Sequence, residues 1–97
     1  MSNRIDFLAR LEAIIHQRLD DGGSGSYTAS LAAAGDRRIA QKVGEEAVEF
    51  ALAAVVGNRD EQLGEAADLV YHLLVLLAVK GLSLGDVTAV LERRHTG

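Results

Sequence analysis

The 97-residue sequence has no cysteine, no proline and no tryptophan, and only 4% of its residues are aromatic. The absence of cysteine excludes a disulfide framework and thiol chemistry. The absence of proline removes the strongest helix breaker, and the abundance of Ala, Leu, Val and Glu favours helices. The longest uninterrupted apolar runs, residues 73–79 and 50–56, have seven residues each, which is far shorter than the roughly 18 residues of a membrane-spanning helix. These absences predict a soluble, helical protein with no membrane partner.

The charge balance is mildly acidic, with 10 Lys and Arg against 14 Asp and Glu and a net charge of −4. It does not favour binding to nucleic acid, and any anionic ligand needs a local site. Charges at Arg4, Asp6 and Arg10 interrupt the first apolar stretch, so we expect no signal peptide and a cytoplasmic location. Residues 1–97 are expected to form a single domain.

Apolar residues recur at three- and four-residue steps, which is typical of amphipathic helices. We expect a helix over residues 3–20, capped by Ser2, and a short one over 27–34, capped by Ser26 and ended by Gly35. A third helix should run from its N-cap Asp36 to Gly57, and a fourth over 59–80, opened by Asn58 and Glu61 and ended by Gly81. A terminal helix should begin after Ser83, with Asp86 completing its capping pattern. Residues 20–26 are expected to form a flexible loop. The second half of the helix 59–80 is apolar nearly all round, and 48% of the chain is apolar. We therefore predict an all-α fold of four to five helices, a helical bundle completed by homo-oligomerisation.

Acidic residues gather on one face of each of two neighbouring helices. They are Glu45, Glu46 and Glu49, with Lys42 beside them, on the first helix, and Glu65 and Asp68, followed by His72, on the second. At 100° per residue each set falls within an arc of roughly 60°, with Glu45 at the edge of the first. The connection between the helices is short, so we expect an antiparallel pair whose acidic faces meet in one cleft.

Converging carboxylates repel one another unless a cation is present. Their oxygens suit Mg²⁺, with Mn²⁺ as a substitute, and a bound divalent ion lets an acidic cleft accept a polyphosphate and activate water. The same residues also have simpler interpretations. The acids fit a solvated helix surface, Lys42 and Glu46 fit an ordinary i,i+4 ion pair, and His72 fits a hydrogen-bonded core histidine.

Three segments together resemble the phosphoribosyl-ATP pyrophosphohydrolases of histidine biosynthesis: 26–29 (SYTA), 38–49 (RIAQKVGEEAVE) and 65–77 (EAADLVYHLLVLL). The resemblance spans about residues 8–94. That family is similar in its ExxE and ExxD motifs to the wider all-α nucleoside triphosphate pyrophosphohydrolases. The resemblance implies Mg²⁺-dependent hydrolysis of phosphoribosyl-ATP between its α and β phosphates. The products would be phosphoribosyl-AMP and pyrophosphate, in the second step of the pathway, and the enzyme would be a homodimer or a higher oligomer.

The resemblance also implies roles for individual residues. The candidate catalytic acids are Glu45, Glu46, Glu49, Glu65 and Asp68, of which Glu46, Glu49, Glu65 and Asp68 match the metal ligands of the family. The candidate substrate-binding residues are Lys42, Arg38, Tyr27, Thr28 and His72. Lys42 fits a phosphate contact, and the arginines at 37, 38, 93 and 94 fit either a contact with the phosphoribosyl phosphate or exposed helix ends.

Other functions stay open on the sequence alone. The short acidic motifs are shared with relatives that hydrolyse other nucleotides, so a house-cleaning pyrophosphatase for dUTP-like or damaged nucleotides is one alternative. A non-catalytic helical interaction module, with the acids as a soluble face, is another. Glu92 and His95 have the ExxH spacing of diiron bundles, but it occurs once where those bundles use it twice. The glycines at 22–25 match no phosphate-binding loop motif.

Overall fold

The structure is a computed structural model, and it describes residues 3–21 and 26–96. Within these residues the chain forms a short 3-10 helix, η1 (Arg4–Asp6), and five α-helices. The α-helices are α1 (Phe7–Asp20), α2 (Tyr27–Ala34), α3 (Asp36–Val56), α4 (Arg59–Val79) and α5 (Leu84–His95). The prediction of an all-α fold with four to five helices is therefore confirmed for the described part of the chain.

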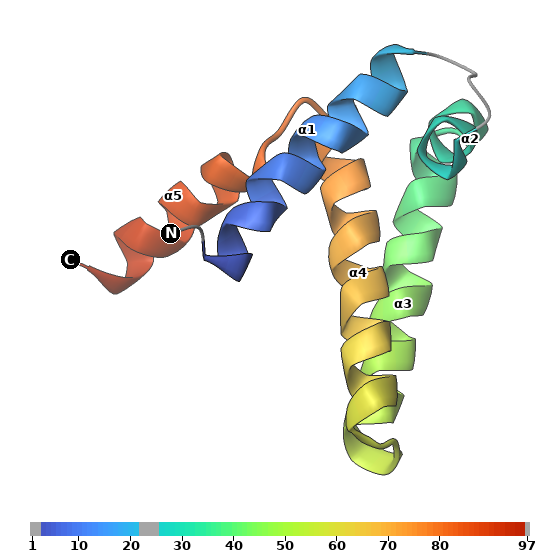
Figure 1. Cartoon of the computed structure of the whole chain (residues 1–97), viewed down its shortest axis with the longest axis vertical. Coiled ribbons are helices and arrows are strands. Elements are labelled where there is room, and N and C mark those ends of the chain that lie inside the picture. The colour runs from blue at the N-terminus through green and yellow to red at the C-terminus, as the bar shows by residue number, and fades with distance from the viewer. Residues whose placement is uncertain (1–2, 22–25, 97) are drawn as a thin grey trace.

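The helices form two arms (Figure 1). One arm is the long antiparallel hairpin of α3 and α4, which make the most extensive contact between any two helices. The other arm contains α1 and α5 and both chain termini, and α2 lies against the first turns of α3. The radius of gyration is 14.6 Å, against about 13 Å for a compact domain of 100 residues. A single chain is therefore more extended than its length requires.

The hydrophobic core lies where α1 and α2 meet the adjoining ends of α3 and α4. Its buried members are Ile15, Leu31, Ile39, Leu74 and Val75. Full burial of one such side chain stabilises the fold by about 1.5–3 kcal/mol. The core thus lies at the base of the hairpin, whereas in the half near Gly57 the main packing among the described residues is between α3 and α4.

Several predicted helix ends are confirmed. The Ser26 hydroxyl accepts a hydrogen bond from the Ala29 backbone N–H at the start of α2, and Asn58 caps α4 in the same way. The capping box of Ser83 and Asp86 opens α5. Ser2 and residues 22–25 of the predicted loop lie outside the described residues. The helix expected over residues 3–20 is η1 followed by α1, with Asn3 as the N-cap of η1.

The prediction of Asp36 as an N-cap is wrong. Gly35 occupies that position, with a φ of 96°, and Asp36 is the first residue of α3. A positive φ is easily adopted only by glycine, and here it lets α2 end and α3 begin at a single residue. The Asp36 carboxylate instead accepts a hydrogen bond from Lys80 Nζ at 3.2 Å, which joins the start of α3 to the end of α4.

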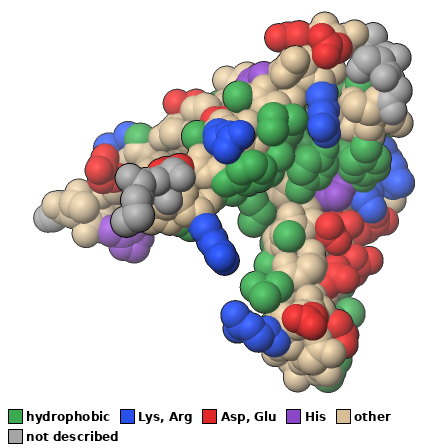
Figure 2. Space-filling model, in the orientation of Figure 1, with side chains coloured by type: hydrophobic (Ala, Val, Ile, Leu, Met, Phe, Trp, Pro, Cys, Tyr) green, Lys and Arg blue, Asp and Glu red, His purple; other side chains and the backbone are tan. Residues whose placement is uncertain are grey.

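Helix α4 is long and apolar enough, by length and composition alone, to cross a membrane, and only 17% of its most apolar window is buried within the chain. The core helix of a soluble protein passes the same test. The uninterrupted apolar run 73–79 is shorter than this window because it stops at the first polar residue on each side. The large apolar side chains exposed along the hairpin are Val48, Leu52, Val55, Val56, Leu63, Val70, Leu73 and Val79. The hairpin therefore has exposed apolar surface as well as the acidic side chains seen in Figure 2.

Candidate functional site

The register of the α3–α4 hairpin is fixed near its tip by a side-chain amide. Gln62 Nε2 donates to the backbone carbonyls of Ala53 and Gly57, each at 3.1 Å. The Ala53 carbonyl also accepts the last backbone bond of α3, from the Gly57 N–H at 2.8 Å, so Gln62 adds a second bond to this carbonyl and one to the residue that ends the helix. The bonds from Gln62 hold the first turn of α4 against α3, so Glu65 faces the acidic side of α3.

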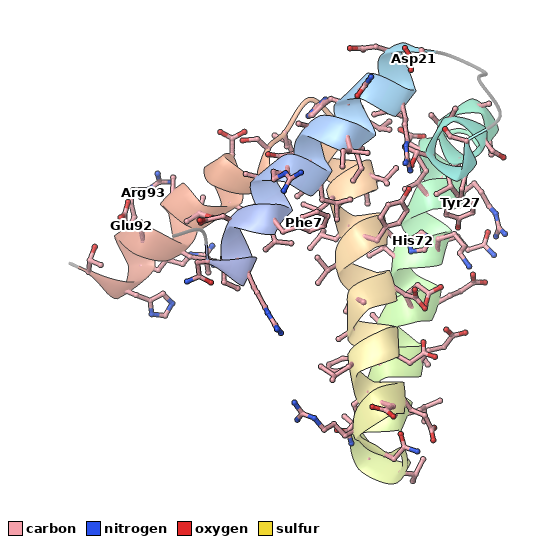
Figure 3. The ribbon with its side chains drawn as sticks, in the orientation of Figure 1. Phe7, Asp21, Tyr27, His72, Glu92 and Arg93 are labelled. Atoms are coloured by element: carbon pink, nitrogen blue, oxygen red, sulfur yellow. The ribbon has the colours of Figure 1, made fainter. Side chains whose placement is uncertain are left out.

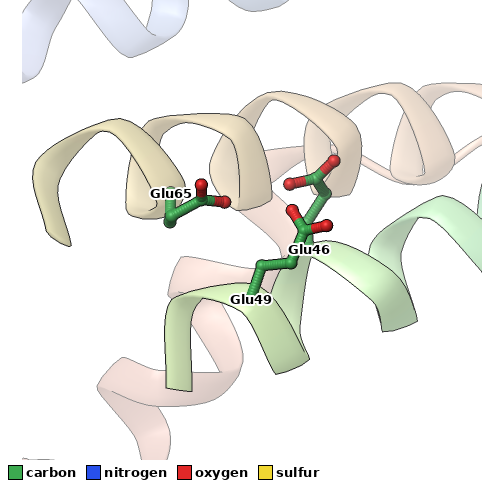
Figure 4. Close-up of side chains that lie close together, drawn as sticks. All are labelled: Glu46, Glu49 and Glu65. Carbon is green, nitrogen blue, oxygen red and sulfur yellow. The ribbon is translucent and has the colours of Figure 1, made fainter. Parts of the chain in front are cut away.

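Three carboxylates meet across this hairpin (Figure 4). One oxygen from each of Glu46, Glu49 and Glu65 lies within 4.8 Å of the other two. Glu46 is buried, with 6% of its surface exposed, Glu65 is half-buried and Glu49 is exposed. The Oε2 atoms of Glu46 and Glu65 are buried and have no hydrogen-bond partner. Like charges and unpaired buried acceptors are both unfavourable, so the cluster is suited to a cation.

Lys42 supplies the positive charge beside this cluster. Its Nζ lies 3.3 Å from Glu46 Oε1 and 3.9 Å from Glu45 Oε1. The hydrogen bond to Glu46 is the main cause that raises the pKa of Lys42 above its ordinary value, with smaller contributions from Tyr27 and the two glutamates. Lys42 is therefore a permanent cation at neutral pH, held at one end of the acid cluster.

Three other predicted residues lie around the cluster rather than in it. Glu45 is exposed and accepts a hydrogen bond from the Gln41 amide at 3.2 Å. Asp68 is exposed, one turn beyond Glu65 on α4, and Arg38 is exposed one turn before Lys42 on α3. The metal role of Asp68, the catalytic role of Glu45 and the substrate contact of Arg38 stay predictions.

Tyr27, Thr28 and His72 meet where α2 docks on α4. The Tyr27 hydroxyl lies 2.7 Å from His72 Nε2, and His72 Nδ1 lies 2.7 Å from the Asp68 carbonyl oxygen. Thr28 has no exposed surface, and its hydroxyl is hydrogen-bonded to the Tyr71 hydroxyl. Sequence analysis gave Tyr71 no role of its own, although it lies directly before His72 in the segment 65–77 that resembles the family. Its partner is 43 residues away in the chain.

The C-terminal residues lie in the other arm. Figure 3 shows Glu92 and Arg93 on α5, far from Tyr27 and His72. The structure of the single chain therefore does not bring Arg93 to the acid cluster. Glu92 also lies outside the group of acids that could share a metal ion among the described residues.

Fold and site together define a class: an all-α protein in which two antiparallel helices bring three carboxylates and a lysine to one place. Residues 8–95 match the family described as phosphoribosyl-ATP pyrophosphohydrolase. The chain belongs to this family, as the resemblance in its sequence predicted.

Individual relatives agree with this assignment. Over 87 residues the chain is 55% identical to the phosphoribosyl-ATP pyrophosphatase of Pyrobaculum calidifontis, covering 90% of this chain and 93% of that protein. Over 89 residues it is 57% identical to the histidine biosynthesis bifunctional protein HisIE of Xanthomonas axonopodis pv. citri, and 54% identical to that of Vibrio cholerae. These two alignments cover 92% of this chain but only 43% and 42% of the bifunctional proteins, so the chain spans about two fifths of their length.

Proposed function

We propose that this chain hydrolyses phosphoribosyl-ATP to phosphoribosyl-AMP and pyrophosphate, the second step of histidine biosynthesis. The family match and the similarity to a phosphoribosyl-ATP pyrophosphatase over nearly its whole length support this proposal. The observation that carries it is the acid cluster, because two of its carboxylate oxygens are buried without a partner beside a fixed lysine.

The donor set fits Mg²⁺, with Mn²⁺ as a substitute. Hard divalent cations prefer carboxylate oxygens, and Mg²⁺ is commonly bound by few protein ligands, which leaves positions for water and substrate phosphates. We propose Glu46, Glu49 and Glu65 as the residues that hold it, with Asp68 as a further ligand. The ion would supply charge neutralisation for the phosphates and a more acidic bound water.

The chain's own residues would bind and orient the substrate. Lys42 lies beside the cluster, and its ammonium group is held in place by the ion pair with Glu46. It is therefore placed to contact a phosphate oxygen and to stabilise the negative charge of the transition state. A water molecule attacks one phosphorus of the α,β bridge, the bridging P–O bond breaks, and the water's atoms are divided between the two products. An exposed carboxylate such as Glu45 is available to accept the proton of that water.

The test is pyrophosphate release from enzymatically prepared phosphoribosyl-ATP with and without Mg²⁺, with ATP and dUTP as controls. We expect metal-dependent release from phosphoribosyl-ATP alone. The variant Glu65→Gln should abolish it, whereas Glu61→Gln, one turn earlier on α4 and outside the cluster, should retain it. Release from ATP or dUTP would instead indicate a house-cleaning pyrophosphatase. No release from a folded sample would indicate a binding module.

We further propose that the active form is a homodimer or a higher homo-oligomer. Val55 and Val56 are each 83% exposed and Leu52 is 61% exposed, on a hairpin that lacks support at its tip. A second hairpin packed against these residues would give a four-helix arrangement with a normal core. Light scattering should give at least twice the mass of one chain. The double variant Leu52→Glu/Val55→Glu should be monomeric, and Ala33→Glu, on the exposed side of α2, should not.

The same packing between two copies would explain why α4 is so apolar in a protein that does not enter a membrane. Its charged Glu65 and Asp68 stand within the helix, and its remaining apolar surface would be covered by α1, α3 and the second copy. We therefore propose a soluble, cytoplasmic protein. Recovery of the protein in the supernatant after high-speed centrifugation without detergent tests this proposal, and recovery in the membrane pellet contradicts it.

A further inference from the structure

The first turn of α2 is fastened to α4 by an aromatic cluster of Tyr27, Tyr71 and His72, of which Figure 3 labels Tyr27 and His72. The rings of Tyr27 and Tyr71 are stacked, with centroids 6.2 Å apart and an angle of 26° between their planes. His72 lies edge-on to both tyrosines, with centroids 5.7 Å and 5.5 Å away. Two pairs of side chains, Tyr27 with His72 and Thr28 with Tyr71, add hydrogen bonds to these ring contacts.

The hydrogen bonds of His72 fix the direction in which Tyr27 donates. A backbone carbonyl oxygen only accepts, so His72 Nδ1 must donate its proton to the Asp68 carbonyl. His72 is 6% exposed, and its ring nitrogens contact the Tyr27 hydroxyl and the Asp68 carbonyl. In the tautomer that carries its proton on Nδ1, Nε2 is an acceptor, and the Tyr27 hydroxyl donates to it.

Tyr27 is consequently both fixed and open to solvent. About half of the residue, 52%, is exposed, although its hydroxyl is anchored and its ring is packed on Tyr71 and His72. Through His72 the phenol is linked to the Asp68 carbonyl, one turn beyond Glu65 on α4, which places Tyr27 next to the helix segment that carries the acids. An exposed aromatic ring that is already ordered offers a stacking surface at little cost in conformational entropy.

We propose that Tyr27 is the platform on which the purine ring of the nucleotide substrate stacks, and that His72 is a positioning residue that holds this platform. The proposal rests on the proposed function, because it assigns the base of the same substrate whose phosphates would meet Lys42 and the acids. In this arrangement the base would lie on Tyr27, and the phosphates would lie beside the Lys42–Glu46 pair. Every nucleobase has a flat π surface, so stacking adds affinity and leaves the chemistry to the acid cluster.

Steady-state kinetics with phosphoribosyl-ATP and Mg²⁺ test the platform. Loss of base stacking should raise KM roughly 10- to 100-fold in Tyr27→Leu, with kcat changed little. Tyr27→Trp keeps a flat ring and should restore most of the affinity. Ser30→Ala, at an exposed position of α2 outside the aromatic cluster, is the control, and its KM should stay that of the wild type. An unchanged KM in folded Tyr27→Leu overturns the proposal.

The role of His72 is tested by a double-mutant cycle. His72→Leu should raise KM about 2- to 10-fold, because Tyr27 must then be ordered on binding. His72→Gln, which can still accept from the Tyr27 hydroxyl, should restore part of the affinity. In the Tyr27→Leu background, His72→Leu should not change KM further, because His72 acts on KM only through the Tyr27 ring. Additive effects of the two substitutions would contradict the positioning role.

A metal-free binding experiment separates this proposal from the proposed reaction. In NMR spectra of AMP with the wild-type protein, ring stacking should shift the adenine H2 and H8 signals upfield, and Tyr27→Leu should abolish the shift. Such shifts without turnover of phosphoribosyl-ATP would support the platform and reject the reaction. Turnover without any Tyr27-dependent shift or KM change would support the reaction and reject the platform.

Discussion

Neutralising Glu46 offers the sharpest test of how the acid cluster works. Glu46 is 6% exposed, its Oε1 is paired with Lys42 at 3.3 Å, and its Oε2 has no partner. Glu65 Oε2 is a second buried acceptor without a hydrogen-bond partner. Each unpaired buried acceptor costs about 1–3 kcal/mol, so the metal-free cluster lowers the free energy of unfolding by about 2–6 kcal/mol. A divalent ion that binds only the folded protein should recover a large part of this cost.

The size of the recovery follows from binding linkage. A ligand present at 100 times its Kd stabilises the folded state by about 2.7 kcal/mol. For a domain of this size each kcal/mol raises Tm by about 4–8 °C. Saturating Mg²⁺ should therefore raise the Tm of the wild-type protein by about 10–20 °C.

The substitution Glu46→Gln should remove most of this shift without weakening the metal-free protein. The amide oxygen can still accept from Lys42, and the amide N–H groups can donate to the carboxylate of Glu49 or Glu65, which lie within 4.8 Å. The metal-free Tm should accordingly equal or exceed that of the wild type. Removal of one negative ligand should leave only a small response to Mg²⁺.

Thermal melts followed by circular dichroism, at one protein concentration and with ionic strength matched by NaCl, measure both effects. Glu45→Gln is the matched control, because it makes the same chemical change at an exposed neighbour outside the cluster and should keep the full shift. A wild-type Tm that does not respond to Mg²⁺ would falsify the metal site. A full shift in Glu46→Gln would exclude Glu46 as a ligand.

Three further predictions concern the charge and packing around the site. Lys42→Met should lower kcat/KM at least about 100-fold because a fixed cation is lost from the phosphate region, and initial rates would show this. Ile39→Ala, at a fully buried position, should cost about 2–5 kcal/mol in urea unfolding at matched protein concentration. Asp36→Asn should be less stable than the wild type at pH 7, because the Lys80 hydrogen bond and charge lower the pKa of Asp36 below 3.8. The stabilisation from the Asp36 carboxylate is fully present above the ordinary pKa of Asp and is lost as the pH falls through the lowered pKa of Asp36. The urea midpoints of the variant and the wild type should therefore converge in acid. A difference between the midpoints that does not change with pH would contradict the ion pair as its cause.

Local patterns predicted most of the secondary structure. Helix periodicity and caps depend on residues three or four positions apart, and so the ends at Ser26, Asn58 and Ser83 follow from the sequence. Asp36 is the exception, because one glycine with a positive φ serves both as the end of α2 and as the cap of α3. The general preference for Asp at N-caps does not predict that one glycine can end one helix and begin the next.

The sequence by itself determined that two neighbouring helices carry acidic stripes, since the angle between residues on a helix is a local property. Tertiary packing decided which acids form the cluster: Glu46, Glu49 and Glu65 converge, whereas Glu45 faces solvent. It also decided the link between Tyr27 and His72, which are 45 residues apart. Burial and contacts of this range depend on how whole helices pack against one another, and no pattern within a single helix contains that information.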